Sequence, residues 1–253
     1  MFHFILRTIP RPILIKLSLI FSIIAPYLYY GNSYEDPISG KTYRKFLPYG
    51  YGGRAKRDNV LCPGSLSLER HRLLWLYLKN KTNFFTAKHK LLHIAPEQCF
   101  YKLFKAMPNI EYVTGDYNSP IADHHFDLHH APFDDNSFDI IFCNHVLEHV
   151  EDADQCMREL YRMMKPGGFG IFQIPQDINR YETYEDKSIV SESERELHFW
   201  QKDHVRLFGL DYNDKLMAAG FIVTVEDFTK EISAELVERY RLPKGELLYL
   251  CRK

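Results

Sequence analysis

From Lys90 onward, short apolar runs alternate with amphipathic stretches, and this alternation limits the fold more than any other feature of the sequence. Such an order predicts an α/β domain with a mainly parallel sheet of seven strands and helices on both faces. The predicted strands are KLLHIA, IEYVTGD, ADHHFDL, SFDIIFCNH, FGIFQIP, FIVTVEDF and GELLYLCR. The predicted helices are PEQCFYKLFKAM, VEDADQCMRELYRMMK (stopped by Pro-Gly-Gly) and DYNDKLMAAG.

Polar residues follow several of these strands. Asp116 ends the second strand, Asp127 the third, and Asn144 and His145 the fourth. Ligands of open parallel sheets bind at the carboxyl ends of the strands, so these positions are candidates for a binding site. Each also has a purely structural interpretation, namely acids that cap loops and a polar strand end.

Composition excludes several classes of protein. Of 253 residues, 45% are hydrophobic, which argues against a disordered chain and a multi-span membrane protein. The 32 basic and 33 acidic residues leave a net charge of -1, so no overall field attracts nucleic acid. The 5 cysteines form no CxxC pair, which is typical of a reducing compartment.

Residues 1–34 form a predicted apolar and basic segment with Arg7, Arg11 and Lys16 but no acid. A helix over residues 13–30 would be about 27 Å long, against about 30 Å for a bilayer core. Four interpretations stay open: a helix in the membrane interface, a helix packed on the protein, a single span, and a cleaved signal. We favour the first, with cations facing anionic headgroups. The expected location is cytoplasmic, peripheral at the inner membrane face.

Residues 35–86 form a predicted small unit that resembles a zinc ribbon, with knuckles at residues 35–40 and 62–65. A structural zinc site needs four thiolate or imidazole ligands, and only Cys62 remains, so we expect no zinc there. A helix is predicted from Ser67, with that residue as N-cap. The basic stretch 41–57 is either a contact for phosphate or lipid headgroups or a solvated loop.

The central run PFDDNSFDIIFCNHVLEHVEDADQCMRELYRMMKPGGFGIFQIP follows LLHIAPE, VTGDYN and FDLHHAPF in order. Together these motifs resemble the class I S-adenosylmethionine-dependent methyltransferases, in a type 11-like group, over residues 87–253. The resemblance implies a Rossmann-like fold, S-adenosyl-L-methionine as cofactor, and methyltransferase activity (EC 2.1.1.-).

The resemblance also implies roles for individual residues. Asp116 would accept the ribose hydroxyls, Asp127 the adenine amino group, and Leu128 would pack on the ring. Asn144 and His145 would face the cofactor and the methyl donor. The first loop departs from the glycine-rich pattern, because Ala95, Glu97 and Cys99 take the glycine positions and His93 that of the usual acid. It is similar to a His-Ile-Ala-Pro-Glu variant, in which His93, Ala95 and Glu97 would contact the cofactor, with Glu97 on its ammonium.

Methyl transfer depends mainly on positioning, and a base helps when the acceptor is a hydroxyl or phenol. The candidate catalytic residues are His145 and His204, whereas His149 is expected to start a helix or to pack. Arg206 could hold an acidic acceptor. The segment 176–200 is interpreted as a lid over the acceptor or as a surface loop. Its possible walls are Tyr181, Tyr184, Phe199 and Trp200.

We expect no metal site. The histidines 124, 125, 129 and 130 alternate along a strand and loop, so at most two could converge from one face.

Three functions remain open. The leading one is methyl transfer to a small-molecule or lipid-like acceptor, with a membrane surface as partner of residues 1–34. The alternatives are a non-catalytic nucleoside-binding module and an RNA-modifying enzyme, the latter disfavoured by the balanced charge. The sequence gives neither the acceptor nor the oligomeric state.

Overall fold

The computed structural model describes residues 11–50 and 56–253 and divides the chain into two compact units. One unit comprises the residues through Asn83 together with Phe228–Glu246, and the other comprises Phe84–Asp227 and Leu247–Lys253. The sequence-based boundaries differ from this division. The described residues up to Asn83 belong to one unit rather than two, and the segment 228–246, assigned from sequence to the second domain, returns to that unit.

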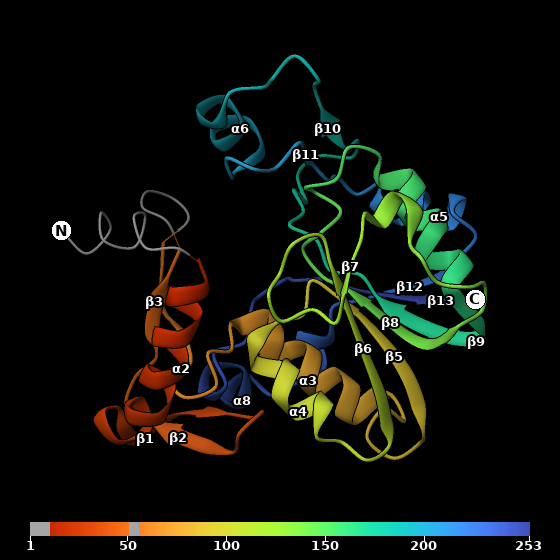
Figure 1. The fold of residues 1–253 in the computed structure, drawn as a ribbon. Helices are drawn as coiled ribbons and strands as arrows, with labels where there is room; N and C mark the ends of the chain where they lie inside the picture. Colours follow the sequence, from red (N-terminus) through yellow and green to blue (C-terminus); the bar gives the residue numbers. More distant parts are fainter. Residues whose placement is uncertain (1–10, 51–55) are drawn as a thin grey trace. The chain divides into compact units, whose positions relative to one another are not determined.

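The second unit is built on a seven-stranded sheet, as predicted (Figure 1). The strand order is β12-β13-β9-β8-β5-β6-β7, in which β13 runs antiparallel to both of its neighbours, β12 and β9, and the remaining neighbours are parallel. The fold is therefore α/β and Rossmann-like. The strands are β5 (His89–Ile94), β6 (Ile110–Asp116), β7 (His124–His125), β8 (Phe138–Cys143), β9 (Met164–Ile171), β12 (Ile222–Glu226) and β13 (Leu248–Arg252).

Helices cover both faces of this sheet because the central strands are apolar on both sides. Leu92 and Ile141 point into a core shared with α5 (Ala153–Met163) and α7 (Tyr212–Ala218). The alternate residues His93 and Phe142 contact the ring of Phe104 in α4 (Gln98–Lys105), at centroid distances of 6.2 and 6.2 Å. All five cysteines are buried free thiols.

Three element boundaries differ from the prediction. β9 already begins at Met164, directly after α5, and includes the Pro-Gly-Gly that was expected to stop the helix. The third strand is reduced to His124–His125, and Asp127 instead caps the short 3-10 helix η2 (Leu128–His130). Helix α3 spans Glu69–Lys81 with Leu68 at the N-cap, so Ser67 is not the cap.

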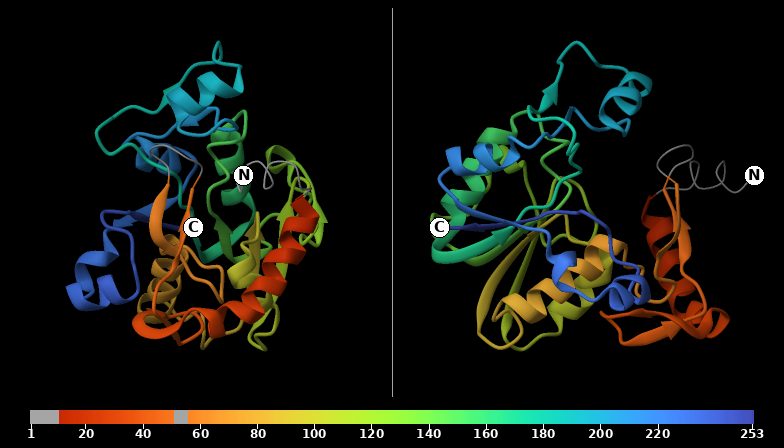
Figure 2. Two further views of the ribbon diagram at one scale, coloured as in Figure 1. Left: turned by 90° about the vertical axis from the view of Figure 1, so that its left-hand side faces the viewer. Right: turned by 180° about the vertical axis from the view of Figure 1, so that it is seen from behind.

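The segment between β9 and α7 forms a small substructure of its own. β10 (Tyr184–Glu185) pairs antiparallel with β11 (Arg206–Leu207), and α6 (Glu192–Phe199) lies between them in sequence. Figure 2 shows α6 and its flanking loops standing out from the seven-stranded sheet.

The first unit combines helices with two small antiparallel sheets, β1-β2 and β3-β4. Arg72 is fully buried there, and its guanidinium donates to the carbonyls of Val60, Tyr240 and Arg241 at 3.0, 2.6 and 2.9 Å. This side chain fastens the returning segment to the unit. The elements are α2 (Arg11–Leu28), β1 (Tyr30–Asp36), β2 (Lys41–Tyr43), β3 (Leu47–Tyr49), β4 (Arg57–Leu61), α3, η3 (Phe228–Glu231) and α8 (Ala234–Arg239).

Side-chain hydrogen bonds close the first predicted knuckle and join it to the residues just after the second. Buried Asp36 accepts from the hydroxyls of Ser39 at 2.7 Å and Ser67 at 3.1 Å. Burial, and then the nearby Asp36 charge, raise the pKa of the Cys62 thiol to about 11. The relationship to a zinc ribbon remains a prediction.

Helix α2 carries a row of solvent-exposed apolar side chains. Within the described residues, no helix has the length and apolarity needed to cross a membrane. The exposed apolar residues at its C-terminal end are Ile23, Ile24, Tyr27 and Leu28.

Candidate functional site

Three neighbouring strands bring candidate residues to one level at the carboxyl edge of the sheet. Ile94 of β5 pairs with Gly115 of β6 and with Cys143 of β8. The next residue on each strand is therefore Ala95, Asp116 or Asn144. The parallel register places these three predicted residues side by side.

Two residues at these strand ends adopt left-handed backbone conformations. Ala95 has φ 51° and His145 has φ 55°. This conformation favours glycine, and other residues adopt it at some cost. Ala95 thus follows the backbone path that glycine would take in the usual loop, and its N–H donates to the Gly115 carbonyl at 2.8 Å.

The variant loop is held by a buried network. The His93 ring is fully buried, with Nδ1 2.9 Å from the Tyr112 hydroxyl and Nε2 in a short contact with Glu97 Oε2. The other Glu97 oxygen accepts from Asn144 Nδ2 at 3.4 Å. Glu97 therefore joins the ends of β5 and β8 through its side chain.

The end of β8 is also tied to the chain after β9. Asn144 Oδ1 accepts from the Gln173 N–H at 3.1 Å, and the His145 N–H donates to the Gln173 carbonyl at 2.8 Å. The structure thus brings together three residues that were predicted to contact the cofactor, His93, Glu97 and Asn144. Their partners Tyr112 and Gln173 were not predicted.

The two predicted adenosine carboxylates make local hydrogen bonds. Asp116 Oδ1 accepts from the N–H groups of Asn118 at 2.8 Å and Ser119 at 2.7 Å. Exposed Asp127 uses Oδ1 for the His129 N–H and ring, and these bonds lower its pKa. Leu128 is buried in the core at 6% exposure. Within the described residues, hydrogen bonds reach Oδ1 alone in both carboxylates.

The two predicted catalytic histidines lie around a buried carboxylate that we did not single out, Glu148. His145 Nδ1 lies 3.4 Å from Glu148 Oε1, and His149 Nε2 lies 3.9 Å from the same oxygen. The His149 ring meets the His204 ring edge-on at a centroid distance of 4.7 Å. The sequence feature that could have identified Glu148 is the Leu-Glu-His-Val motif, which contains it.

Burial dominates the electrostatics of this cluster. Desolvation lowers the pKa of His204, and the nearby Glu148 charge opposes that effect. Desolvation would raise the pKa of Glu148, but the contact with His145 and the charges of His145 and His149 outweigh it and leave that pKa lowered. His149 lies before α5 and does not start it, because the helix begins at Ala153 with Asp152 as N-cap.

Arg206 has a structural role, which corrects its predicted role as a holder of an acidic acceptor. Its guanidinium is buried and donates to the Glu185 carboxylate at 3.0 Å and to the carbonyls of Leu147 and Glu151, each at 2.7 Å. The guanidinium also donates to the Val150 carbonyl.

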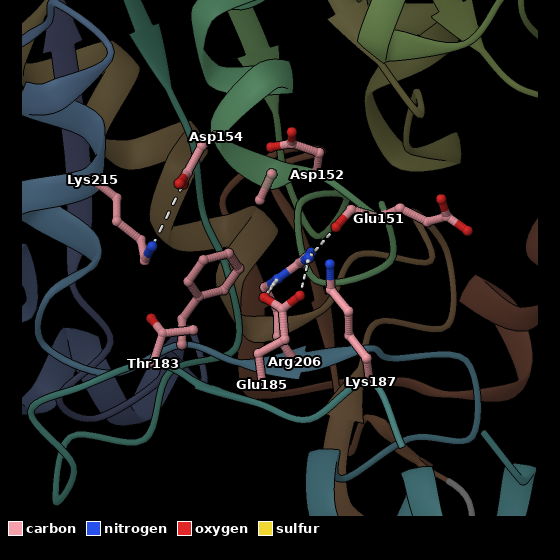
Figure 3. Close-up of a pocket in the computed structure, with 10 residues that line it drawn as sticks. Glu151, Asp152, Asp154, Thr183, Glu185, Lys187, Arg206 and Lys215 are labelled. Carbon is pink, nitrogen blue, oxygen red and sulfur yellow. Dashed lines mark hydrogen bonds and ion pairs between the residues drawn. The ribbon is translucent and has the colours of Figure 1, made fainter. Parts of the chain in front are cut away.

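A polar cleft of about 270 Å³ lies beside this arginine, between the start of α5, the β10–β11 ribbon and α7 (Figure 3). Its lining carries both charges, and Lys215 forms an ion pair with Asp154 at 3.5 Å. None of the predicted cofactor residues or lid aromatics lines it. The lining residues are Glu151, Asp152, Ala153, Asp154, Thr183, Glu185, Lys187, Arg206, Phe208 and Lys215.

The predicted lid aromatics do not share one surface. Phe199 is fully buried, whereas Tyr181 and Trp200 are 66% and 47% exposed. Tyr184 packs on Phe199 at 5.3 Å.

Three of the four clustered histidines make separate side-chain contacts. His124 packs on Phe133, His125 meets the Ser119 carbonyl, and His129 bonds Asp127.

Comparison with known proteins gives a family match within the second unit. Residues 86–172 match the family model described as a methyltransferase domain. A demethylmenaquinone methyltransferase of Lactobacillus johnsonii is 44% identical over 54 residues, which is 21% of this chain and 22% of that protein. A malonyl-[acyl-carrier protein] O-methyltransferase of Halorhodospira halophila is 31% identical over 101 residues, 40% of this chain and 32% of that protein.

The chain thus matches about a quarter to a third of the length of these curated relatives. Among solved structures, an S-adenosylmethionine-dependent methyltransferase from Archaeoglobus fulgidus superimposes with a TM-score of 0.47 at 16% identity, covering 72% of this chain and 93% of that one. Residues 86–172 are thus similar to a methyltransferase domain, and this similarity falls within the α/β unit that carries the seven-stranded sheet.

Proposed function

We propose that this protein binds S-adenosyl-L-methionine at the carboxyl ends of β5, β6 and β8 and transfers its methyl group to a small-molecule or lipid-like acceptor. The main support is the register that aligns Ala95, Asp116 and Asn144 at one edge of the sheet, within a segment matched by a methyltransferase model. Such an edge is where open α/β sheets bind nucleotides.

The proposed cofactor contacts use carboxylates at the strand ends and in the segments that follow them. Asp116 Oδ1 orients the carboxylate through its turn, and Oδ2 would accept the ribose hydroxyls. Asp127 would accept the adenine amino group, with Leu128 beneath the ring. Glu97, held by His93 and Asn144, would bind the ammonium group of the cofactor.

The proposed reaction is an in-line displacement. The bond from the sulfonium to the methyl carbon breaks as the bond from the acceptor to that carbon forms, and S-adenosylhomocysteine leaves. His145, at the end of β8, would take the proton of an oxygen acceptor, and His204 would act through the cluster around Glu148. Positioning supplies most of the rate, because the sulfonium is already activated.

The lipid-like acceptor is supported by two observations. One relative is named for demethylmenaquinone and others for ubiquinone and menaquinone biosynthesis. In the first unit, exposed apolar residues on α2 lie close in sequence to Tyr29, whose ring has Arg44 and Lys45 at 5.9 Å each. Cations beside an apolar surface fit the surface of an anionic membrane.

Calorimetry with S-adenosylhomocysteine tests the cofactor site. The full chain should bind one equivalent, and Asp116→Ala should weaken the affinity at least 10-fold because two ribose bonds are lost. Asp134→Ala, an exposed acid outside the site, is the matched control. Equal affinity of Asp116→Ala and the wild type would refute this placement of the nucleoside.

Vesicle flotation tests the membrane surface as a partner. The full chain should float with vesicles containing phosphatidylglycerol and less with phosphatidylcholine alone. Replacing Ile23 and Tyr27 by serine should abolish flotation, whereas Leu236→Ser, an exposed apolar residue of α8, should not. Flotation that survives the α2 substitutions would refute the role of this helix.

A further inference from the structure

Buried polar atoms around Glu148 lack hydrogen-bond partners within the residues that the structure describes. They are both carboxylate oxygens of Glu148, Nε2 of His145 and Nε2 of His204. Buried polar atoms in proteins are nearly always paired, and each exception needs an explanation. Here several electron-pair donors gather at one place, which indicates a ligand that accepts electron pairs.

The orientation of two histidine rings supports this interpretation. His149 Nδ1 lies 3.1 Å from the Asp203 carbonyl, and His204 Nδ1 lies 2.8 Å from the Phe199 carbonyl. A carbonyl can only accept, so each Nδ1 carries the proton and each Nε2 keeps a lone pair. Histidines that bind metals usually donate their other ring N–H in this way, which fixes the tautomer and aims the ring.

The donor atoms also converge. One donor atom each from Glu148, His149 and His204 lies within 4.8 Å of the other two, and this is the one such group found among the described residues. In a tetrahedral site with bonds of about 2.1 Å, ligand atoms lie about 3.4 Å apart. Since His149 Nε2 is 3.9 Å from Glu148 Oε1, small side-chain rotations would complete the geometry.

The backbone under the cluster is held in place by other bonds. The Val205 N–H donates to the Glu148 carbonyl at 2.9 Å, which joins the residue after His204 to the carboxylate segment. Arg206 donates to the Leu147 carbonyl at 2.7 Å. The ligands therefore come from two segments that are already fixed against each other.

We propose that Glu148, His149 and His204 form a binding site for a divalent transition metal ion of the Zn²⁺ type. Two imidazoles and one carboxylate are the ligand set of many catalytic zinc sites, which keep a fourth position open. The side chain of His149 is 34% exposed, so the open position faces solvent on that side. His145 would orient Glu148 from outside the first coordination sphere. From sequence we expected no metal site, and the histidines considered for one were 124, 125, 129 and 130.

This site is independent of nucleoside binding. If the proposed function also holds, the open position would take an acceptor oxygen beside His145, and the metal would make its proton easier to lose. That second part rests on the proposed function, whereas metal binding itself can be measured without any nucleoside.

The test is a competition titration of the chelator-treated full chain with Zn²⁺ against a chromophoric chelator. One equivalent should bind. His149→Ala and Glu148→Gln should each lower the affinity at least 100-fold, and His145→Ala should lower it about 10- to 100-fold, as expected for an outer partner. His89→Ala, a histidine at the amino end of β5, is the matched control and should bind as the wild type does.

Cobalt provides a second measurement that does not depend on affinity. Co²⁺ in the same site should give the strong visible absorption of a four-coordinate ion, and His149→Ala should remove it. Melting curves in chelator show whether each variant is folded, and His149 is the ligand whose removal disturbs the core least. Stoichiometric Zn²⁺ binding that is unchanged in His149→Ala, or no binding by the folded wild type, would overturn the proposal. Preference for Mn²⁺ or Mg²⁺ over Zn²⁺ would overturn the assigned metal class.

Discussion

The end of β8 separates two polar clusters of similar composition and different completeness. On one side, the His93–Glu97–Asn144 cluster has partners for both ring nitrogens of His93, both carboxylate oxygens of Glu97, and the amide nitrogen and oxygen of Asn144. On the other, the Glu148 cluster leaves both carboxylate oxygens and two ring nitrogens without hydrogen bonds in the described structure. Each of these atoms in the first cluster has a protein partner, although a carboxylate oxygen of Glu97 can still accept a second bond from the cofactor ammonium. The atoms of the second cluster are open to a ligand. Stability and ligand binding should therefore respond differently to mutation of the two.

Removing the support of the Glu148 cluster should have the largest effect. Arg206→Met leaves the Leu147 carbonyl and the Glu185 carboxylate without their buried donor. Because the Glu185 side chain is partly exposed, most of the loss comes from the backbone carbonyls left unpaired, at about 1–3 kcal/mol of unfolding free energy each. Urea unfolding measures this, with Arg180→Met, whose side chain is 47% exposed, as control. A loss as small as that of the control would mean that the cluster needs no such support.

Mutation of the His93–Glu97–Asn144 cluster should affect stability and leave metal binding unchanged. His93→Ala deprives Tyr112 and Glu97 of a buried partner, for a loss of about 2–4 kcal/mol. In chelator, His149→Ala should change the unfolding free energy by less than about 1 kcal/mol, because its ring is partly exposed. Equal losses in the two variants would remove the distinction between the clusters.

The left-handed backbone at Ala95 allows a test of whether the first loop must approach the cofactor closely. Ala95→Val places a β-branched residue at φ 51° and should cost about 1–2 kcal/mol, while Ala95→Gly should be tolerated. Affinity for S-adenosylhomocysteine should fall in the valine variant and persist in the glycine variant. Equal binding by the two variants would show that close backbone approach at this loop is not required.

The partly exposed ion pair between Arg162 and Glu159 should give the smallest loss of unfolding free energy. Arg162 bonds both oxygens of Glu159, at 2.8 and 2.9 Å, and this pairing lowers the pKa of Glu159. A lowered pKa in the folded state adds stability that is present above the ordinary pKa and is lost as the pH falls through the folded value. Glu159→Gln should therefore cost about 1 kcal/mol at pH 7 and less below pH ~4. A loss that is independent of pH would assign the effect to packing.

Sequence patterns predicted the sheet well because each strand carries its own apolar run. They also identified Asp116, Asn144 and His145 as strand-end residues, since parallel strands end at one edge. They could not predict that Glu97 is bound by His93, because both side chains fit several partners. Nor did they identify Glu148, since a carboxylate inside a helix-start motif looks like a capping residue until burial is known.

The return of Phe228–Glu246 to the first unit has a practical consequence. This segment connects β12 to β13, so the polypeptide passes between the units more than once. A recombinant fragment beginning near Phe84 would retain that excursion while losing Arg72, which binds its Tyr240 and Arg241 carbonyls. Shortened versions intended for crystallisation should therefore replace the excursion by a tight hairpin turn between β12 and β13.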